Sequence, residues 1–138
     1  GSDRDNEELR ELWKPILDEF KVDLVLSGHD HTYARTGQVD TTDLKNVPTG
    51  YQQAYDPNIG TVHVVSVSGP KMYGISKGNY AKRVAENTQL YQIIHINDKS
   101  LQYEAYEATG KLYDKFTLQK RKGMPNLLLE ALPTENRK

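Results

Sequence analysis

Two histidines separated by a single residue are the side chains of this sequence best suited to chemistry. His29 and His31 follow directly after the apolar run 22–27, and Gly28 leaves room for the backbone to approach a bound ion. In an extended segment alternate side chains point to the same side, so we expect both imidazoles to face one metal ion or two neighbouring ions. Imidazole is a common ligand of zinc, iron and manganese. The spacing therefore predicts a metal-binding loop at the end of a buried strand.

A bare pair of histidines also has a simpler interpretation, in which both lie in a loop and make only local hydrogen bonds. The preceding apolar run and the following residues 32–35 (Thr-Tyr-Ala-Arg) favour the metal interpretation over that alternative. The two remaining histidines, His63 and His95, lie in expected strands beside β-branched residues. We interpret them as packed or edge histidines rather than as ligands.

The elements expected around this pair alternate between helix and strand in the first part of the chain. Residues 5–20 carry apolar side chains at intervals of three and four, which predicts a helix with one apolar face. Asp5 and Glu8 have the spacing of a capping box, and Pro15 must kink or restart this helix. The run 22–27 then follows as a buried strand.

The rest of the sequence predicts strands separated by two long loops, 36–60 and 71–87. Strands are expected at 61–68, 89–96, 100–107 and 111–118, the last three as an antiparallel meander. Loop side chains could line a pocket or hold a phosphate, or could simply be solvated; they are Tyr51, Tyr55, Tyr73, Tyr80, Lys71, Lys77, Lys82 and Arg83. The fold class is α+β, with a tail of uncertain structure from residue 120 onward.

The composition excludes several classes of site. The chain has 138 residues, no cysteine and a formal net charge of −1. Disulfide scaffolds, thiolate metal sites and cysteine nucleophiles are therefore excluded, and no basic field indicates nucleic acid. No apolar run approaches the length of a membrane span. Gly1-Ser2 at the start is typical of the remnant of a cleaved tag.

Residues 22–33 resemble the final Gly-His-x-His motif of the calcineurin-like metallophosphoesterases, in particular of the purple acid phosphatase branch. The preceding helix and residues 60–69 and 109–116 are also similar to that family. The resemblance implies the C-terminal part of an αββα sandwich, with one N-terminal helix and mostly antiparallel strands. We expect residues 1–2 to be a tag remnant, 3–119 to belong to the metallophosphoesterase domain, and 120–138 to form a C-terminal tail.

The resemblance also assigns roles to single residues. His31 resembles the ligand of the first metal, the Fe(III) position, and His29 resembles a ligand of the second, divalent metal. Tyr33 and Arg35 are candidates for a substrate pocket, and Arg35 matches the family's arginine in position. Ala34 departs from the glutamate that is usual there, which favours a bacterial relative of broader substrate range. The implied cofactors are two metal ions, with iron, zinc or manganese as the candidates.

The other ligand motifs of that family, Asp-x-Gly, Gly-Asp-x-x-Tyr, Gly-Asn-His and an upstream histidine, are not found in this sequence. We therefore expect the C-terminal portion of a longer enzyme that hydrolyses phosphate esters, with weak metal binding and no activity in this chain alone. The sequence itself leaves the compartment open, and only the family resemblance implies an extracytoplasmic (periplasmic or secreted) location. The partner would be a phosphate ester bound through the missing half, and an exposed sheet edge could support self-association. The alternative is a non-catalytic accessory or interaction domain with a degenerate histidine pair.

Overall fold

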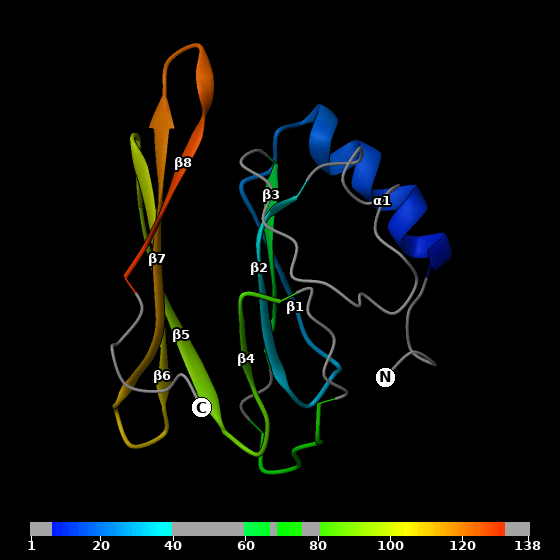
Figure 1. The fold of residues 1–138 in the computed structure, drawn as a ribbon, viewed down its shortest axis with the longest axis vertical. Helices are drawn as coiled ribbons and strands as arrows, with labels where there is room; N and C mark the ends of the chain where they lie inside the picture. Colours follow the sequence, from blue (N-terminus) through cyan, green and yellow to red (C-terminus); the bar gives the residue numbers. More distant parts are fainter. Residues whose placement is uncertain (1–6, 40–59, 67–68, 76–80, 132–138) are drawn as a thin grey trace.

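The chain folds into one helix and two four-stranded sheets. The computed structural model describes residues 7–39, 60–66, 69–75 and 81–131. The elements are α1 (Glu7–Glu19), β1 (Leu24–Ser27), β2 (Tyr33–Val39), β3 (Thr61–Val65), β4 (Arg83–Ala85), β5 (Leu90–Asn97), β6 (Ser100–Glu107), β7 (Leu112–Arg121) and β8 (Met124–Glu130). The first sheet has the order β1-β3-β2-β4 and the second sheet the order β5-β6-β7-β8. Figure 1 shows three layers, with the first sheet between α1 and the second sheet.

Strand pairing in both sheets agrees with an α+β class. Only β1 and β3 pair in parallel, with Leu24 opposite Val62, and every other described pair is antiparallel. A parallel pair needs a crossover, whereas the second sheet is a plain meander joined by tight turns. In one of those turns the Asn97 side chain accepts hydrogen bonds from the backbone N–H groups of Lys99 and Ser100. The predicted meander is therefore confirmed.

The hydrophobic core lies between the two sheets. Alternate residues of β3 separate its faces, because Val62 and Val64 are buried against the second sheet while His63 points the other way, toward α1. Tyr103 and Phe116 stack with ring centroids 4.7 Å apart in the middle of this core. The buried hydrophobic residues are Tyr33, Val62, Val64, Ala85, Leu90, Tyr103, Ala105, Phe116 and Leu118. Burial of each large side chain contributes about 1.5–3 kcal/mol, so this layer holds the two sheets together.

Helix α1 has the predicted apolar face, but much of that face is exposed. Leu12 is 62% exposed and Trp13 is 54% exposed, whereas the charged Lys14 is only 2% exposed. Lys14 contacts Asp18 one turn later. The helix continues through Pro15 without a break in its span.

Two predicted loops contain strands, so those predictions are wrong in part. Residues 36–39 belong to β2 and residues 83–85 form β4. Pairing with β3 overrides the weak strand propensity of the Thr-Gly-Gln stretch. At the irregularity in that pairing, the Thr36 hydroxyl accepts a hydrogen bond from the His63 N–H at 3.0 Å. A neighbouring side chain thus replaces a missing ladder bond, which the local sequence does not reveal.

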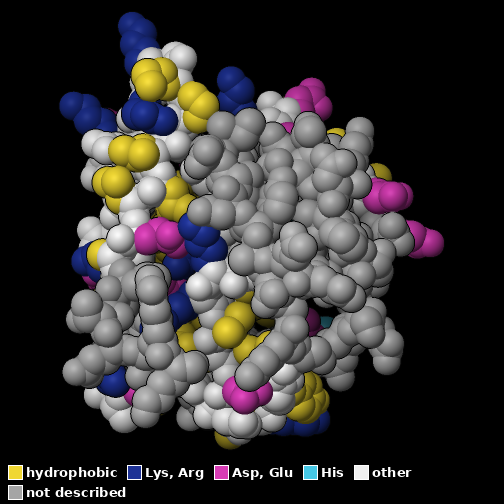
Figure 2. All heavy atoms as spheres, viewed as in Figure 1, with side chains coloured by type: hydrophobic (Ala, Val, Ile, Leu, Met, Phe, Trp, Pro, Cys, Tyr) yellow, Lys and Arg dark blue, Asp and Glu magenta, His cyan; other side chains and the backbone are white. Residues whose placement is uncertain are grey.

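The C-terminal stretch also forms a strand. β8 pairs with β7, with Phe116 opposite Glu130, and the turn between them uses Gly123 at φ 71°. The expected domain boundary between residues 119 and 120 therefore falls inside β7. Figure 2 shows hydrophobic and basic side chains together where β7 and β8 lie, and exposed Met124 and Leu129 are on β8. β8 is the last strand in the order of the second sheet, and self-association through this sheet edge stays a prediction.

Among residues 7–39, 60–66, 69–75 and 81–131, no helix has the length and apolar character that a bilayer crossing requires.

Candidate functional site

The loop that carries the two histidines joins β1 to β2. Residues 29–32 form bends, and His29 has φ of 76°, in the left-handed region. The prediction of an extended segment here is wrong, and with it the argument that the two imidazoles must point to one side. A left-handed residue reverses the chain locally, which alternation along a strand does not describe. His29 is exposed, whereas His31 is half-buried.

The His31 imidazole is held by residues far away in the sequence. Its Nδ1 atom is hydrogen-bonded to the carbonyl oxygen of Lys71. Because a carbonyl only accepts hydrogen bonds, Nδ1 must be the donor and carry the proton. The Tyr73 ring lies 4.8 Å from the imidazole, between centroids, and the Tyr73 N–H donates to the His31 carbonyl at 2.8 Å. In the neutral ring, Nε2 is then left with its lone pair.

This arrangement suits a metal ligand. Histidines that bind metal usually donate their other ring N–H to a carbonyl or carboxylate, which fixes the tautomer. His31 therefore fits the role of a ligand through Nε2. Among the described residues no three His, Cys, Asp or Glu side chains converge. Catalytic zinc takes about three protein ligands, so the described residues do not provide a full set.

The backbone of His29 leads to a stability prediction. A side chain at positive φ is strained, and glycine relieves that strain whereas alanine does not. We expect His29→Gly to be more stable than His29→Ala by about 1 kcal/mol in urea unfolding. At His31, where φ is not positive, alanine should be the more stable of the two. Equal stabilities of the two His29 variants would contradict the left-handed assignment.

Tyr33 and Arg35, the candidates for a substrate pocket, lie in the core instead. Tyr33 is 1% exposed and Arg35 is 0% exposed. The Arg35 guanidinium binds the carboxylate of Asp114 through Nε at 2.6 Å and Nη2 at 3.0 Å, and the Tyr33 hydroxyl donates to the same carboxylate at 2.6 Å. Arg35 Nη1 also binds Glu130 at 2.7 Å. In this structure both side chains join the two sheets, and neither is accessible to a substrate.

The electrostatics of this cluster follow from burial and from Asp114. Burial, followed by the Asp114 carboxylate, raises the pKa of Tyr33, so its hydroxyl stays protonated. Burial opposes the charged form of Arg35, but its hydrogen bonds to Asp114 prevail and its pKa is raised. Partial burial opposes the charged form of Glu130 in the same way, and Arg35 nevertheless lowers the pKa of that carboxyl. Arg35 and Glu130 are therefore both charged around neutral pH, whereas the Tyr33 hydroxyl is neutral.

His63 lies beneath α1, on the opposite face of the first sheet from the core. Burial lowers its pKa to about 4, and the positive charge of Lys14 acts in the same direction. Its Nε2 atom is buried and has no hydrogen-bond partner among the described residues. His95 is exposed on β5. The placement of His63 is that of a packed histidine.

The remaining predicted loop residues have separate positions. Lys82 binds Glu130 at 3.2 Å, and the Arg83 guanidinium donates to the carbonyl of Tyr113 at 2.7 Å. Lys71 and Tyr73 lie against His31 although they are 40 and 42 positions away from it in the sequence. Tyr51, Tyr55, Lys77 and Tyr80 lie outside the described residues.

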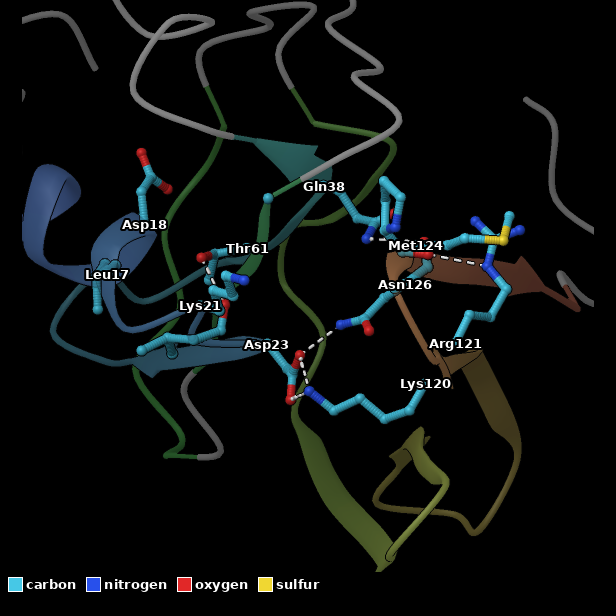
Figure 3. Close-up of a pocket in the computed structure, with 14 residues that line it drawn as sticks. Leu17, Asp18, Lys21, Asp23, Gln38, Thr61, Lys120, Arg121, Met124 and Asn126 are labelled. Carbon is cyan, nitrogen blue, oxygen red and sulfur yellow. Dashed lines mark hydrogen bonds and ion pairs between the residues drawn. The ribbon is translucent and has the colours of Figure 1, made fainter.

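A groove of about 720 Å³ opens at the other end of β1. Figure 3 shows it between the end of α1, the start of β1 and the turn from β7 to β8. The Asp23 carboxylate in this groove is bound by Lys120 at 2.6 Å and by the Asn126 side chain. His29 lies two residues after the last residue of β1, whereas Asp23 directly precedes its first, so the groove is separate from the histidine loop.

Comparison with known proteins gives a partial match at both the sequence and the structure level. No family model matches the chain. Two curated proteins of Mycobacterium tuberculosis, uncharacterized protein MT2654 (strain CDC 1551 / Oshkosh) and uncharacterized protein Rv2577 (strain ATCC 25618 / H37Rv), are each 35% identical over 66 residues. The match covers 44% of this chain and only 12% of either relative.

A solved structure shows a similar fold. The purple acid phosphatase PPD1 from yellow lupin (Lupinus luteus) seeds matches with a TM-score of 0.54 and 23% sequence identity. The match covers 85% of this chain and 20% of that structure. The chain thus shares the fold of a portion of a purple acid phosphatase, and it spans a small share of the length of each protein that it matches.

Proposed function

We propose that this chain is the C-terminal portion of a dinuclear-metal phosphoesterase and contributes His29 and His31 as metal ligands. The observation that carries the proposal is the hydrogen bond from His31 Nδ1 to the Lys71 carbonyl, because it leaves Nε2 as a ligand nitrogen. The fold shared with part of the lupin phosphatase supports the same interpretation. The remaining ligands would come from residues outside this chain.

The chemistry follows from the proposed ligands. When bound, two ions drawn from iron, zinc and manganese would supply the positive charge that polarises a phosphate ester and lowers the pKa of water. The chain's own task is to present imidazole nitrogens in their neutral form at the end of β1. His31 has a fixed ring, whereas His29 is exposed on a strained backbone. His31 is therefore the better prepared of the two ligands.

Activity measurements test the proposal directly. We expect the 138-residue chain, incubated with iron, zinc or manganese and then dialysed, to retain little metal and to hydrolyse para-nitrophenyl phosphate no faster than buffer does. In a longer protein that carries this chain, His31→Ala should lower the rate by at least about 100-fold, the upper range for loss of a metal-site contact. His95→Ala, which removes an exposed histidine on β5, is the matched control.

Two results would contradict the proposal in different ways. Sustained turnover by the metal-loaded chain, lost in His29→Ala, would show that this chain contains a complete site. It would refute the proposal that the remaining ligands lie outside the chain. A longer protein with full activity after His31→Ala would refute the ligand role. The alternative, a non-catalytic accessory domain with a degenerate histidine pair, would be favoured if the region upstream of this chain lacked aspartate, Gly-Asn-His and histidine motifs.

A further inference from the structure

Residues 71–75 form a short segment that is tied down on both sides. At one side the Tyr73 N–H donates to the His31 carbonyl at 2.8 Å. At the other, the Ile75 N–H donates to the Glu86 carboxylate at 2.9 Å, and a Cβ atom added at Gly74 would lie 3.5 Å from the same carboxylate oxygen. The segment therefore links the histidine loop to the residue that follows β4. We call residues 71–75 the strap.

The strap makes two separate contacts with the His31 ring. The Lys71 carbonyl accepts the hydrogen bond from Nδ1, which fixes both the tautomer and one axis of the ring. The Tyr73 ring lies 4.8 Å away at an angle of 41°, which limits rotation about that axis. A hydrogen bond alone would leave the ring free to swing, and a ring contact alone would leave the tautomer open. Together they define where Nε2 points.

Lys71 also reinforces the second contact. Its ammonium group lies 5.3 Å from the centroid of the Tyr73 ring, within the range of a cation–π interaction. The carbonyl of Lys71 thus holds the imidazole, while its side chain holds the tyrosine that packs against the same imidazole. No comparable set of contacts is described for His29, which is exposed and left-handed.

We propose that the strap is a positioning device for His31, with Tyr73 as its positioning residue, and that it prepares Nε2 for a metal before any metal arrives. The inference rests on the proposed function and adds an order to it: His31 binds first and His29 follows. Contacts behind a metal-ligating histidine change metal affinity by about 10–100-fold, so the strap should act through affinity rather than through the fold.

Nitrogen NMR of the histidine rings in the metal-free chain tests the tautomer. The spectra of the original chain and of the variants are compared at a pH of about 8. We expect His31 to be protonated at Nδ1. Because the Lys71 carbonyl is unchanged, we expect Tyr73→Leu and Tyr73→Phe both to keep this tautomer, whereas unconstrained histidine in water prefers the Nε2-protonated form.

Titration with zinc alone, followed through the same ring signals, tests the order of binding. We expect the His31 signals to move at lower zinc concentration than those of His29, and Tyr73→Leu to raise the required concentration about 10-fold. Tyr91→Leu removes an exposed aromatic that stacks on Tyr106 in the second sheet and serves as the matched control. Far-UV circular dichroism checks that every variant keeps its fold.

Each outcome tests the positioning role of the strap independently of the proposed phosphoesterase activity. Protonation of His31 at Nε2 in the original chain would contradict the positioning role of the strap, and so would a Tyr73→Leu variant with an unchanged zinc response. Failure of millimolar zinc to move the His31 signals at all would also overturn it. None of these results depends on turnover. A failed activity assay would therefore contradict the phosphoesterase proposal without contradicting the positioning role of the strap.

Discussion

Asp114→Ala is expected to lower the free energy of unfolding by about 3–5 kcal/mol, because it breaks a buried ion pair. Asp114 and Arg35 are each 0% exposed, and Asp114 accepts bonds from Arg35 and Tyr33. Removing the carboxylate leaves a guanidinium buried between the sheets, with Glu130 as its remaining carboxylate partner among the described residues. Urea unfolding followed by far-UV circular dichroism measures the loss.

Two further variants separate this loss from a general sensitivity to mutation. Glu104→Ala removes one side of a less buried ion pair with Lys115, and we expect it to cost at most about 1 kcal/mol. The double variant Arg35→Met/Asp114→Leu removes both charges, so it should recover most of the stability lost in Asp114→Ala. A double variant that is less stable than Asp114→Ala would contradict the view that an unpaired buried charge causes the loss.

The second large effect is a loss of stability on mild acidification. Burial and Lys14 lower the pKa of His63 to about 4, whereas the unfolded chain has the ordinary value of 6.5. As the pH falls below 6.5, the histidine is protonated in the unfolded state but stays neutral in the folded state. The free energy of unfolding therefore decreases until the pH reaches about 4. Between about pH 7.5 and pH 5 the expected loss is about 2 kcal/mol.

Urea unfolding at several pH values checks this expectation. His63→Gln should remove most of the loss above pH 5, because the titrating group is gone. His95→Gln, at an exposed position on β5, should leave the profile as it is. Glu104, whose pKa is lowered to about 2 mainly by its hydrogen bond to Lys115, contributes its own loss only at lower pH. A flat profile between pH 7.5 and pH 5 would contradict the burial of neutral His63.

The sequence predicted those elements whose pattern is local. The strand predicted at 100–107 is β6 with its bounds unchanged, and β3 and β5 lie within a few residues of their predictions. Alternation of apolar residues is enough to define such strands. β2 and β8 were missed because Gly37 and Pro125 weaken the strand pattern, and pairing with a neighbour supplies what the local sequence lacks.

The candidate site was harder to predict because its contacts are not local. The sequence predicts Arg35 as a pocket residue, because nothing near it in the sequence indicates its partner carboxylate, Asp114, 79 positions later. The partners of His31 lie 40 and 42 positions downstream, in a stretch that is rich in polar residues and has no regular pattern. His63 is different, because β-branched neighbours in a strand were enough to indicate a packed side chain.

The exposed face of α1 has a practical consequence for spectroscopy. The chain has one tryptophan, Trp13, and it lies on that face with 54% of its surface exposed. Its emission should already be close to that of indole in water in the folded chain, so it is a poor reporter of the packing between the two sheets. The same property makes it an intrinsic probe for anything that comes to cover the helix, since its emission would shift to shorter wavelength while the tyrosine signals of the core stayed constant.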